Sequence, residues 1–347
     1  MILNKTTFAF IAILFNSLLF SQTNTANVNL VDFNSTAVYG PGSGVSVHFE
    51  PQGIYKFDNE ADDNQFILEL SELGGGFASS SVISTVNGFF TTTINAIIPA
   101  GTVAGNYRLR VKATKAMLAD GSTFGAILSS ESDVFSVNST VSAAVTIYSG
   151  ITPNTTQFDC TVQDEFNTDP MFGSLGLSTG DTSVIFTDTK RKLRISNQNA
   201  SVTYKLRMID AVNSTVTDLG LFTGASYIIA DDLPMGSYNF ELEALATSGT
   251  SSVYTAVFVM HKSTTVLANE SSETICVGNE VNFSIDTSNS GIGLNYGGSY
   301  YTINFGDGTP IEVFTQAEIL FNNLIPHEFL TVSCGEVGSE FTIEKKQ

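Results

Sequence analysis

Side chains that could carry chemistry are few and widely spaced in this sequence. The densest group of oxygen ligands is Asp58-Asn59-Glu60-Ala61-Asp62-Asp63-Asn64. A hard cation such as Ca²⁺ takes roughly six to eight oxygen ligands, and this segment could donate several of them. It lacks the Asp-x-Asp-x-Asp-Gly spacing of an EF-hand loop. A solvated loop without a bound metal is therefore the favoured interpretation, with Ca²⁺ as the weaker alternative.

The thiols and imidazoles are equally scattered. The three cysteines are Cys160, Cys276 and Cys334, and the three histidines are His48, His261 and His327. The cysteine spacing provides no Cys-x-x-Cys metal site. Because three is an odd number, one thiol is unpaired or pairs with another chain.

Motifs for hydrolysis are missing from the sequence. It contains no Gly-x-Ser-x-Gly elbow, no His-Glu-x-x-His helix and no Cys/His pair with a recognisable local context. A carboxylate pair for glycoside cleavage stays open, because any two acids can meet in a fold. However, sugar clefts usually need stacking aromatic rings, and the chain has no Trp. We therefore expect a protein that is not an enzyme and has no cofactor.

Composition narrows the class of protein further. The 347 residues carry a formal net charge of −19, with only 15 Lys and Arg. So few basic residues argue against binding to nucleic acid and to anionic membrane surfaces. The 29 Gly, 26 Phe and 11 Tyr suit an all-β protein, and 42% hydrophobic residues are enough to give each of two or three domains a core.

The first residues are expected to be a targeting signal and not part of the fold. Lys5 gives a positive start, residues 8–20 are apolar except for Asn16 and Ser17, and the polar segment 21–24 follows. We interpret 1–21 as a cleaved signal peptide, in preference to an N-terminal anchor. No Cys follows the apolar run, and no later run approaches membrane-spanning length. The mature chain is therefore expected to be exported, outside the cell or at its surface, without insertion into the membrane.

From residue 22 to 139 the sequence predicts an Ig-like β-sandwich. Short alternating segments bounded by Gly and Pro are typical of such folds. In the segment 105–111, Tyr107, Leu109 and Val111 are expected to face a core, while Arg108 and Arg110 face water. The expected strands are 28–31, 44–49, 66–71, 91–98, 105–111 and 133–137.

A second Ig-like unit is predicted over 140–263. Residues 201–208 and 225–229 are expected strands, and Phe240, Leu242 and Ala244 alternate with Glu241 and Glu243. Its turn Leu233-Pro234-Met235-Gly236-Ser237-Tyr238 is a shorter form of the 99–107 turn in the first unit. The strands of 158–189 cannot be placed from the sequence.

In the last unit, 264–347, one hairpin organises the sequence. Tyr301, Ile303 and Phe305 alternate with polar residues, Gly306-Asp307-Gly308 follows, and 311–314 resumes the alternation. Asp-Gly between two alternating runs is a strong hairpin signal. Asp307 is expected to favour the turn through its own hydrogen bonds, in preference to binding a metal.

Tyr-x-Ile-x-Phe-Gly-Asp-Gly followed by His327-Glu328-Phe329 resembles the signature of polycystic-kidney-disease (PKD) domains. With Cys276 and Cys334 near its two ends, the unit resembles PKD-type repeats of secreted Bacteroidetes proteins associated with adhesion and gliding motility. The 70–107 region is similar to repeated modules of Bacteroidetes surface proteins. Members of the PKD-type family usually continue into more repeats and a sorting domain for type IX secretion, and some PKD domains bind Ca²⁺. The resemblance implies that the first strand and a late strand lie close together, and hence a disulfide between Cys276 and Cys334 that leaves Cys160 free.

Taken together, the sequence predicts three serial β-sandwich modules, two Ig-like and one PKD-type. Because sandwiches in series share small interfaces, we expect independent modules joined near 137–141 and 261–265. The predicted function is a surface scaffold or adhesin that contacts extracellular protein or glycan surfaces. The alternative is a set of accessory modules of an extracellular hydrolase or polysaccharide-binding protein.

Overall fold

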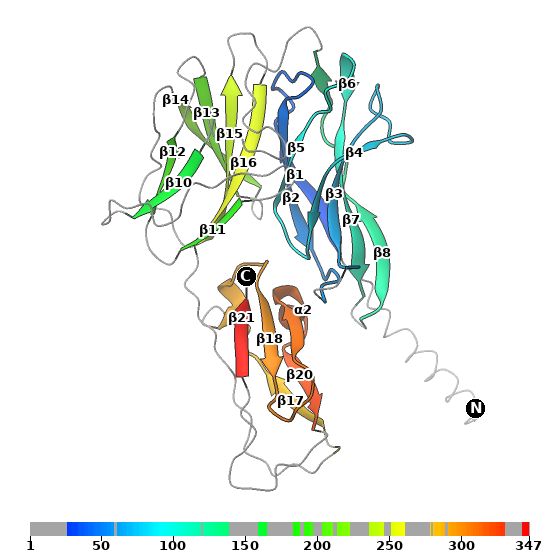
Figure 1. Ribbon diagram of the computed structural model, residues 1–347, viewed down its shortest axis with the longest axis vertical. Coiled ribbons are helices and arrows are strands. Elements are labelled where there is room, and N and C mark those ends of the chain that lie inside the picture. Colours follow the sequence, from blue (N-terminus) through cyan, green and yellow to red (C-terminus); the bar gives the residue numbers. More distant parts are fainter. Residues whose placement is uncertain are drawn as a thin grey trace, which may run out of the picture.

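The computed structural model confirms an all-β protein and arranges its strands in three units (Figure 1). Among the described residues, no helix has the length and apolar character needed to cross a bilayer. The residues that the structure describes are 26–58, 61–118, 121–138, 159–164, 183–187, 191–196, 203–210, 214–222, 236–245, 251–260, 278, 280–288, 291–329 and 342–346. The predicted signal peptide, 1–21, lies outside these ranges.

The first unit is a sandwich of two antiparallel sheets. One sheet has the strand order β1-β2-β5 and the other β4-β3-β7-β8, while β6 and β9 form a short pair. All six predicted strands are present, and β4 and β8 are additions to them. The bounds are β1 Asn27–Phe33, β2 Gly44–Gln52, β3 Gln65–Leu70, β4 Ser81–Asn87, β5 Thr93–Ile97, β6 Gly105–Tyr107, β7 Leu109–Met117, β8 Thr123–Leu128 and β9 Phe135–Val137.

Alternating apolar side chains fill the space between these two sheets. Phe49 of β2 meets Phe66 of β3, with ring centroids 5.4 Å apart and both side chains fully buried. The expected strand 105–111 is divided at Arg108, because Tyr107 pairs with β9 whereas Leu109 pairs with β3. Both of those side chains are buried on the core side, as the alternation predicts.

The second unit is built on a five-stranded sheet of order β11-β16-β15-β13-β14, with β10 and β12 as a separate pair. Tyr204 and Leu206 of β13 are buried with Phe240 and Leu242 of β15. The expected strand 201–208 corresponds to β13, whereas 225–229 lies outside the described residues. The bounds are β10 Asp159–Asp164, β11 Ser183–Thr187, β12 Arg191–Ser196, β13 Thr203–Asp210, β14 Thr215–Phe222, β15 Gly236–Leu245 and β16 Ser251–Met260.

The third unit contains the predicted hairpin and one helix that the alternation did not predict. The hairpin strands β18 and β19 pair between Tyr300↔Thr315 and Ile303↔Glu312. Thr315 then caps the helix α2 in a reciprocal capping box with Glu318, which stops β19 and starts the helix. The bounds are β17 Glu280–Ser284, the 3₁₀ turn η1 Ile292–Leu294, β18 Tyr300–Asn304, β19 Glu312–Thr315, α2 Gln316–Phe321, β20 Leu324–Glu328 and β21 Thr342–Lys346.

The expectation of independent modules is wrong for the first two units. Their sheets lie side by side, with β2 and β5 of the first unit against β16 of the second (Figure 1). The third unit sits below them and turns α2 toward the first. Phe90 lies at the meeting point of all three, because it packs against Val257 of the second unit and Tyr296 of the third.

Candidate functional site

The most unusual feature of the described residues is a polar joint between the first two units. In β2, Val45, Val47 and Phe49 face the first unit's own core, so Ser46 and His48 face the opposite way. Strands with one polar face normally turn that face to water. Here that face is covered by the second unit, and Ser46 and His48 are fully buried.

The same alternation operates on the other side of the joint. In β15, Phe240 and Leu242 belong to the buried interior of the second unit, so Asn239, Glu241 and Glu243 point toward the first. The Glu241 side chain is 0% exposed, although a Glu in a Glu-x-Glu pattern on a strand would ordinarily be expected in water. The two polar faces therefore bury each other.

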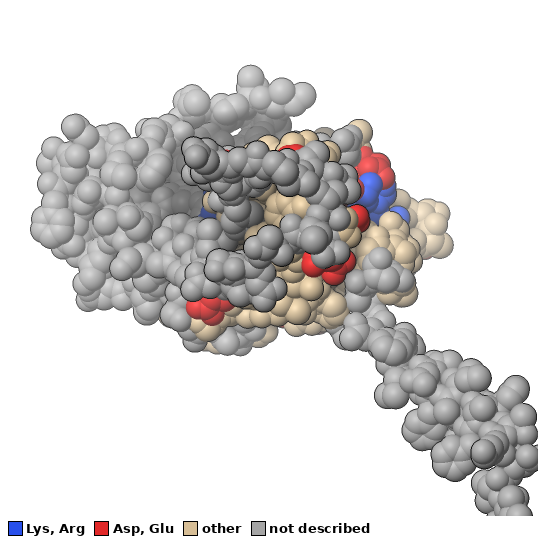
Figure 2. Space-filling model, turned by 90° about the horizontal axis from the view of Figure 1, so that it is seen from below, with Lys and Arg blue, Asp and Glu red and all other residues tan. Residues whose placement is uncertain are grey.

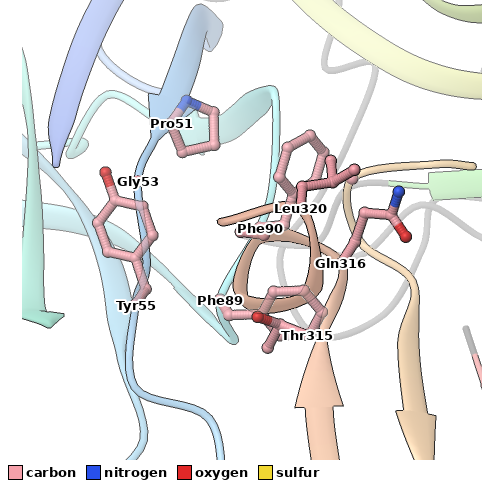
Figure 3. Close-up of a pocket in the computed structure, with 10 residues that line it drawn as sticks. Pro51, Gly53, Tyr55, Phe89, Phe90, Thr315, Gln316 and Leu320 are labelled. Carbon is pink, nitrogen blue, oxygen red and sulfur yellow. The ribbon is translucent and has the colours of Figure 1, made fainter. Parts of the chain in front are cut away.

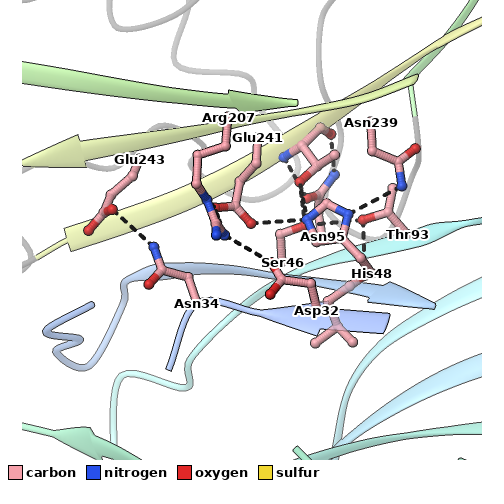
Figure 4. A network of polar contacts seen from close by, with 12 residues as sticks. Asp32, Asn34, Ser46, His48, Thr93, Asn95, Arg207, Asn239, Glu241 and Glu243 are labelled. Atoms are coloured by element: carbon pink, nitrogen blue, oxygen red, sulfur yellow. Dashed lines mark hydrogen bonds and ion pairs between the residues drawn. The ribbon is translucent and has the colours of Figure 1, made fainter. Parts of the chain in front are cut away.

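Charged groups cross the joint in complementary pairs (Figure 4). His48 Nε2 lies 3.0 Å from Glu241 Oε2, and Thr255 Oγ1 lies 3.3 Å from the same ring nitrogen. The guanidinium of Arg207 donates from Nε to Glu241 Oε1 at 2.9 Å and from Nη2 to Asp32 Oδ2 at 3.0 Å. One guanidinium of the second unit thus binds a carboxylate from each unit.

Uncharged groups complete the joint. Asn95 and Thr255 exchange two hydrogen bonds: Asn95 Nδ2 donates to the Thr255 carbonyl at 2.9 Å, and the Thr255 amide donates to Asn95 Oδ1 at 3.0 Å. The Gly44 amide donates to Ser252 Oγ at 3.2 Å. Further bonds across the joint are Ser46–Thr255 at 2.7 Å, Asn34–Glu243 at 2.9 Å and Thr92–Asn239 at 2.9 Å.

Burial and ion pairing shift the pKa values of Glu241 and Arg207 in opposite directions. Burial alone would raise the pKa of Glu241, but the hydrogen bond and charge of His48, together with Arg207, hold it below its ordinary value. Burial alone would lower the pKa of Arg207, whereas Glu241 and Asp32 raise it. Glu241 and Arg207 therefore remain a charged pair at neutral pH, which is the state in which each satisfies the other.

Asp32, His48 and Glu241 also have the composition of a metal site. One ligand atom from each lies within 4.8 Å of the others. However, the Arg207 guanidinium already bonds both carboxylates, and a divalent cation between them would face that positive charge. The donor set therefore fits an arginine and not a metal, and we assign no metal here.

A side chain at Gly44 would test how closely the two units approach. A Cβ added there would lie 3.1 Å from the Val253 carbonyl oxygen of the second unit. We expect Gly44→Val to destabilise the chain by about 1–3 kcal/mol, because the sheets would have to separate. Denaturant unfolding measures this. Gly101→Val is the matched control, since a Cβ at Gly101 meets nothing within 4 Å; equal losses in both variants would contradict close packing of the joint.

The motif residues of the third unit form a second cluster. His327 stacks on Phe305 with ring centroids 3.6 Å apart and planes 7° from parallel, and Phe329 meets the imidazole edge-on at 4.8 Å. His327 Nε2 lies 3.1 Å from Asp307 Oδ2. The aromatic strand, the Gly-Asp-Gly turn and the late His are thus brought together.

The rest of the motif is structural. Tyr301 and Ile303 are buried in the unit's core, and the Tyr301 hydroxyl donates to Gln316 Oε1 at 2.6 Å. The positive φ angles fall on Gly306 (73°) and Gly308 (85°) rather than on the Asp between them. The connection is longer than a two-residue Asp-Gly turn, because β18 ends at Asn304 and β19 begins only at Glu312.

Asp307 is held by its own turn. Its Oδ1 accepts from the Thr309 amide at 3.1 Å and from Thr309 Oγ1 at 2.6 Å, which confirms the turn interpretation. Burial alone would raise the pKa of Asp307, but the bonds from Thr309 and His327 lower it to about 2. Ionised Asp307 therefore stabilises the third unit above the ordinary Asp pKa of about 3.9, and this contribution is lost as the pH falls toward 2.

Removing the Asp307 carboxylate should expose this dependence. Asp307→Ala should lower the free energy of unfolding of the third unit by about 1.5–3 kcal/mol at pH 7, because it leaves three donors without their acceptor. The variant should also lose the wild-type change in stability between about pH 4 and 2. Thermal unfolding against pH measures both. Glu328→Gln, an exposed change on β20, should leave the curve unaltered; an unaltered curve for Asp307→Ala would contradict the assignment.

In the acidic segment 58–64, two of the described carboxylates, Asp58 and Asp62, pair with lysines. Lys56 Nζ lies 2.6 Å from Asp62 Oδ1, and Lys115 Nζ lies 2.9 Å from Asp62 Oδ2. These bonds lower the pKa of Asp62 to about 2. Asp63 Oδ1 accepts from the Asp58 amide at 2.8 Å. The arrangement favours a solvated loop that is tied to β7, over a calcium site.

Two small hollows lined by described residues flank the helix α2. One of about 170 Å³ lies between the first and third units, where Tyr55, Phe89 and Phe90 face Leu320 and Gln316 (Figure 3). Another of about 160 Å³ lies on the other side of α2, next to Phe321 and Met117. Both are below the roughly 300–1,000 Å³ of common small-molecule pockets, whereas a third hollow of about 310 Å³, beside Phe57, Asp63 and Asn87, is at the lower end of that range. From below, the described surface is mostly uncharged, with acidic side chains in separate patches (Figure 2).

The predicted disulfide lies outside the described residues. Neither Cys276 nor Cys334 is in the described set, and for Cys160 only the backbone, in β10, is described. The pairing Cys276–Cys334 therefore stays a prediction.

Comparisons with known proteins find similar solved structures but no matching family. No protein-family model matches the chain, and no curated protein matches its sequence.

Solved structures with similarity include the fibronectin(III)-like modules of Clostridium thermocellum CbhA, at 12% identity over 67% of this chain and 93% of that one, with a TM-score of 0.19. A tetra-tandem repeat from the extending region of a large adhesion protein matches at 12% identity over 93% and 70%, with a TM-score of 0.25. The chicken CNTN1 FN1–FN3 domains match at 10% identity over 88% of each chain, with a TM-score of 0.24. Similarity at this level carries no argument about function.

Proposed function

We propose that this chain is a non-enzymatic scaffold or adhesin, exported to the cell surface, that contacts extracellular protein or glycan surfaces. The observation that carries the proposal is the position of the side chains that could act as acids or bases. His48 and Glu241 would be the natural candidates for acid–base work, and both side chains are 0% exposed between two sheets, where they bind each other. Glu241 also binds Arg207, whose side chain is 16% exposed. A substrate cannot reach His48 or Glu241 in this arrangement.

Rigidity supports the same role. A scaffold must hold its contact surfaces at fixed positions, and the joint fixes the first unit against the second through bonds from several strands. The aromatic contacts of Phe57 with Tyr300 and of Phe90 with Tyr296 add the third unit to this block. The loops and sheet edges of such a block remain available for a partner.

Two parts of the proposal, export and affiliation with PKD-type repeats, are inferred from the sequence. The apolar run 8–20 supports a signal peptide, and the motif Tyr301 to Gly308 with His327 supports affiliation with PKD-type repeats of secreted Bacteroidetes surface proteins. The proposal therefore includes a role in adhesion or gliding motility, with type IX secretion as the expected export route.

Two measurements on the mature chain test this proposal. Screening on peptide, ester and glycoside substrates should give no turnover, and coated extracellular-matrix proteins and glycan arrays should show binding that survives Glu241→Gln. Turnover that disappears when a single carboxylate or serine is replaced would contradict the scaffold role. Absence of binding to every coated protein and glycan would contradict the adhesive role.

A further inference from the structure

The joint between the first two units differs from an ordinary permanent interface in what it buries. Interfaces that never open are rich in apolar side chains. Here the groups that meet are mainly hydroxyls, amides and charges, and the apolar contribution comes from side chains such as Val253, Val257 and Phe90. Either polar face would be an ordinary solvent-facing side of a sandwich if the units parted.

Opening would therefore expose groups that water can satisfy. Asn95 and Thr255 exchange hydrogen bonds across the joint, and the Gly44 amide donates one to Ser252 Oγ. Water could replace each of these partners. The strand pairing within each sheet does not depend on the joint, because β2 pairs with β1 and β5, whereas β15 pairs with β13 and β16. The units can separate while each keeps its own sheets.

The charges across the joint decide which state is favoured. When the carboxylates are ionised, Asp32 of the first unit faces Arg207 of the second, and Glu241 of the second faces His48 of the first. When Glu241 is neutral, the negative charge that lies between Arg207 of the second unit and His48 of the first is gone, and the Arg207 guanidinium is left at the joint with less compensating charge.

Other titratable groups near the joint do not reverse the preference for the closed state when Glu241 is ionised. Glu243 pairs with Asn34, which is uncharged, and Lys205 is paired with Asp218 on the outer strand β14. Tyr39 donates its hydroxyl to the Asn34 carbonyl, and burial raises its pKa well above the ordinary value, so it stays neutral. Strands β5 and β16 contribute only uncharged groups among the contacts described above.

We propose that the joint is a reversible clasp, closed while Glu241 is ionised and open once it is protonated. The closed state is the compact block, and the open state is a row of separately folded units. This inference goes beyond the proposed function, because it holds whatever the scaffold binds.

Hydrogen exchange at single amides of the full-length mature chain tests the clasp. The amides of Gly44 and Thr255 donate across the joint, whereas those of β3 and β13 report on the sheets within each unit. Protection of Gly44 and Thr255 should hold from pH 7 down to the ordinary Glu pKa of about 4.3 and should be lost progressively below it, because the closed joint holds the pKa of Glu241 lower than the open one does. Protection of the β3 and β13 amides should persist, and small-angle X-ray scattering should show a longer particle.

Variants separate the clasp from general acid unfolding. In Asp32→Asn/Glu241→Gln, the pH-dependent change at Gly44 and Thr255 should disappear, whether the variant is closed or already open at pH 7. Asp62→Asn, which alters an exposed carboxylate bonded to two lysines, should keep the wild-type change. The proposal is overturned if the wild-type joint stays protected until the sheets themselves unfold. It is equally overturned if the change persists in the double variant.

Discussion

Replacing Arg207 with alanine should destabilise the chain by about 3–5 kcal/mol, because it leaves the buried carboxylate of Glu241 without its cation. Glu241 is 0% exposed and would retain only His48, while Asp32 would lose its partner across the joint. Arg207→Lys should recover only part of the loss, because an ammonium cannot reproduce the fork that bonds both carboxylates. Denaturant unfolding at pH 7, followed by tyrosine fluorescence, gives the free energies.

The control for Arg207 lies two residues away on the same strand. Lys205 pairs with Asp218, and the two side chains are 34% and 57% exposed. Because exposed ion pairs contribute about 0–1 kcal/mol, Lys205→Ala should have a small effect. If Arg207→Ala were no more destabilising than Lys205→Ala, the joint would not be buried as described.

Replacing Phe305 with alanine should destabilise the third unit by about 3–5 kcal/mol. The ring is 1% exposed, stacks on His327 and lies 5.3 Å from Phe283, so its removal leaves a cavity and an unsupported imidazole. The measurement is the midpoint of thermal unfolding of this unit. Phe321→Ala is the matched control, because that ring is 56% exposed on α2 and should change stability by less than about 0.5 kcal/mol. Similar midpoints for the two variants would contradict the placement of Phe305 in the core.

The strands could be predicted where a single face is apolar. Alternation in 44–49 and 66–71 gives β2 and β3 because their apolar face fills a core. Alternation could not reveal that the chain crosses between sheets at Arg108, since the side-chain period continues through the break. The helix α2 was missed as well, although Thr315 and Glu318 have the spacing of a capping box.

The joint could not be predicted from local patterns. His48 lies 193 residues from Glu241, and nothing in either strand indicates that its polar face meets another. A Glu on a strand fits a solvent-facing position as well as it fits a buried pair. The contacts among Phe305, Asp307 and His327 also join residues from separate segments, so alternation alone could not predict them.

The central claim is that the first two units are one rigid body at neutral pH. Residual dipolar couplings of backbone amides in β2, β3 and β7 and in β13, β15 and β16, measured at pH 7, test it most directly. If the joint holds, both sets of couplings fit a single alignment tensor with the relative orientation seen in Figure 1. Two tensors of different magnitude for the two units would show independent motion and contradict the account.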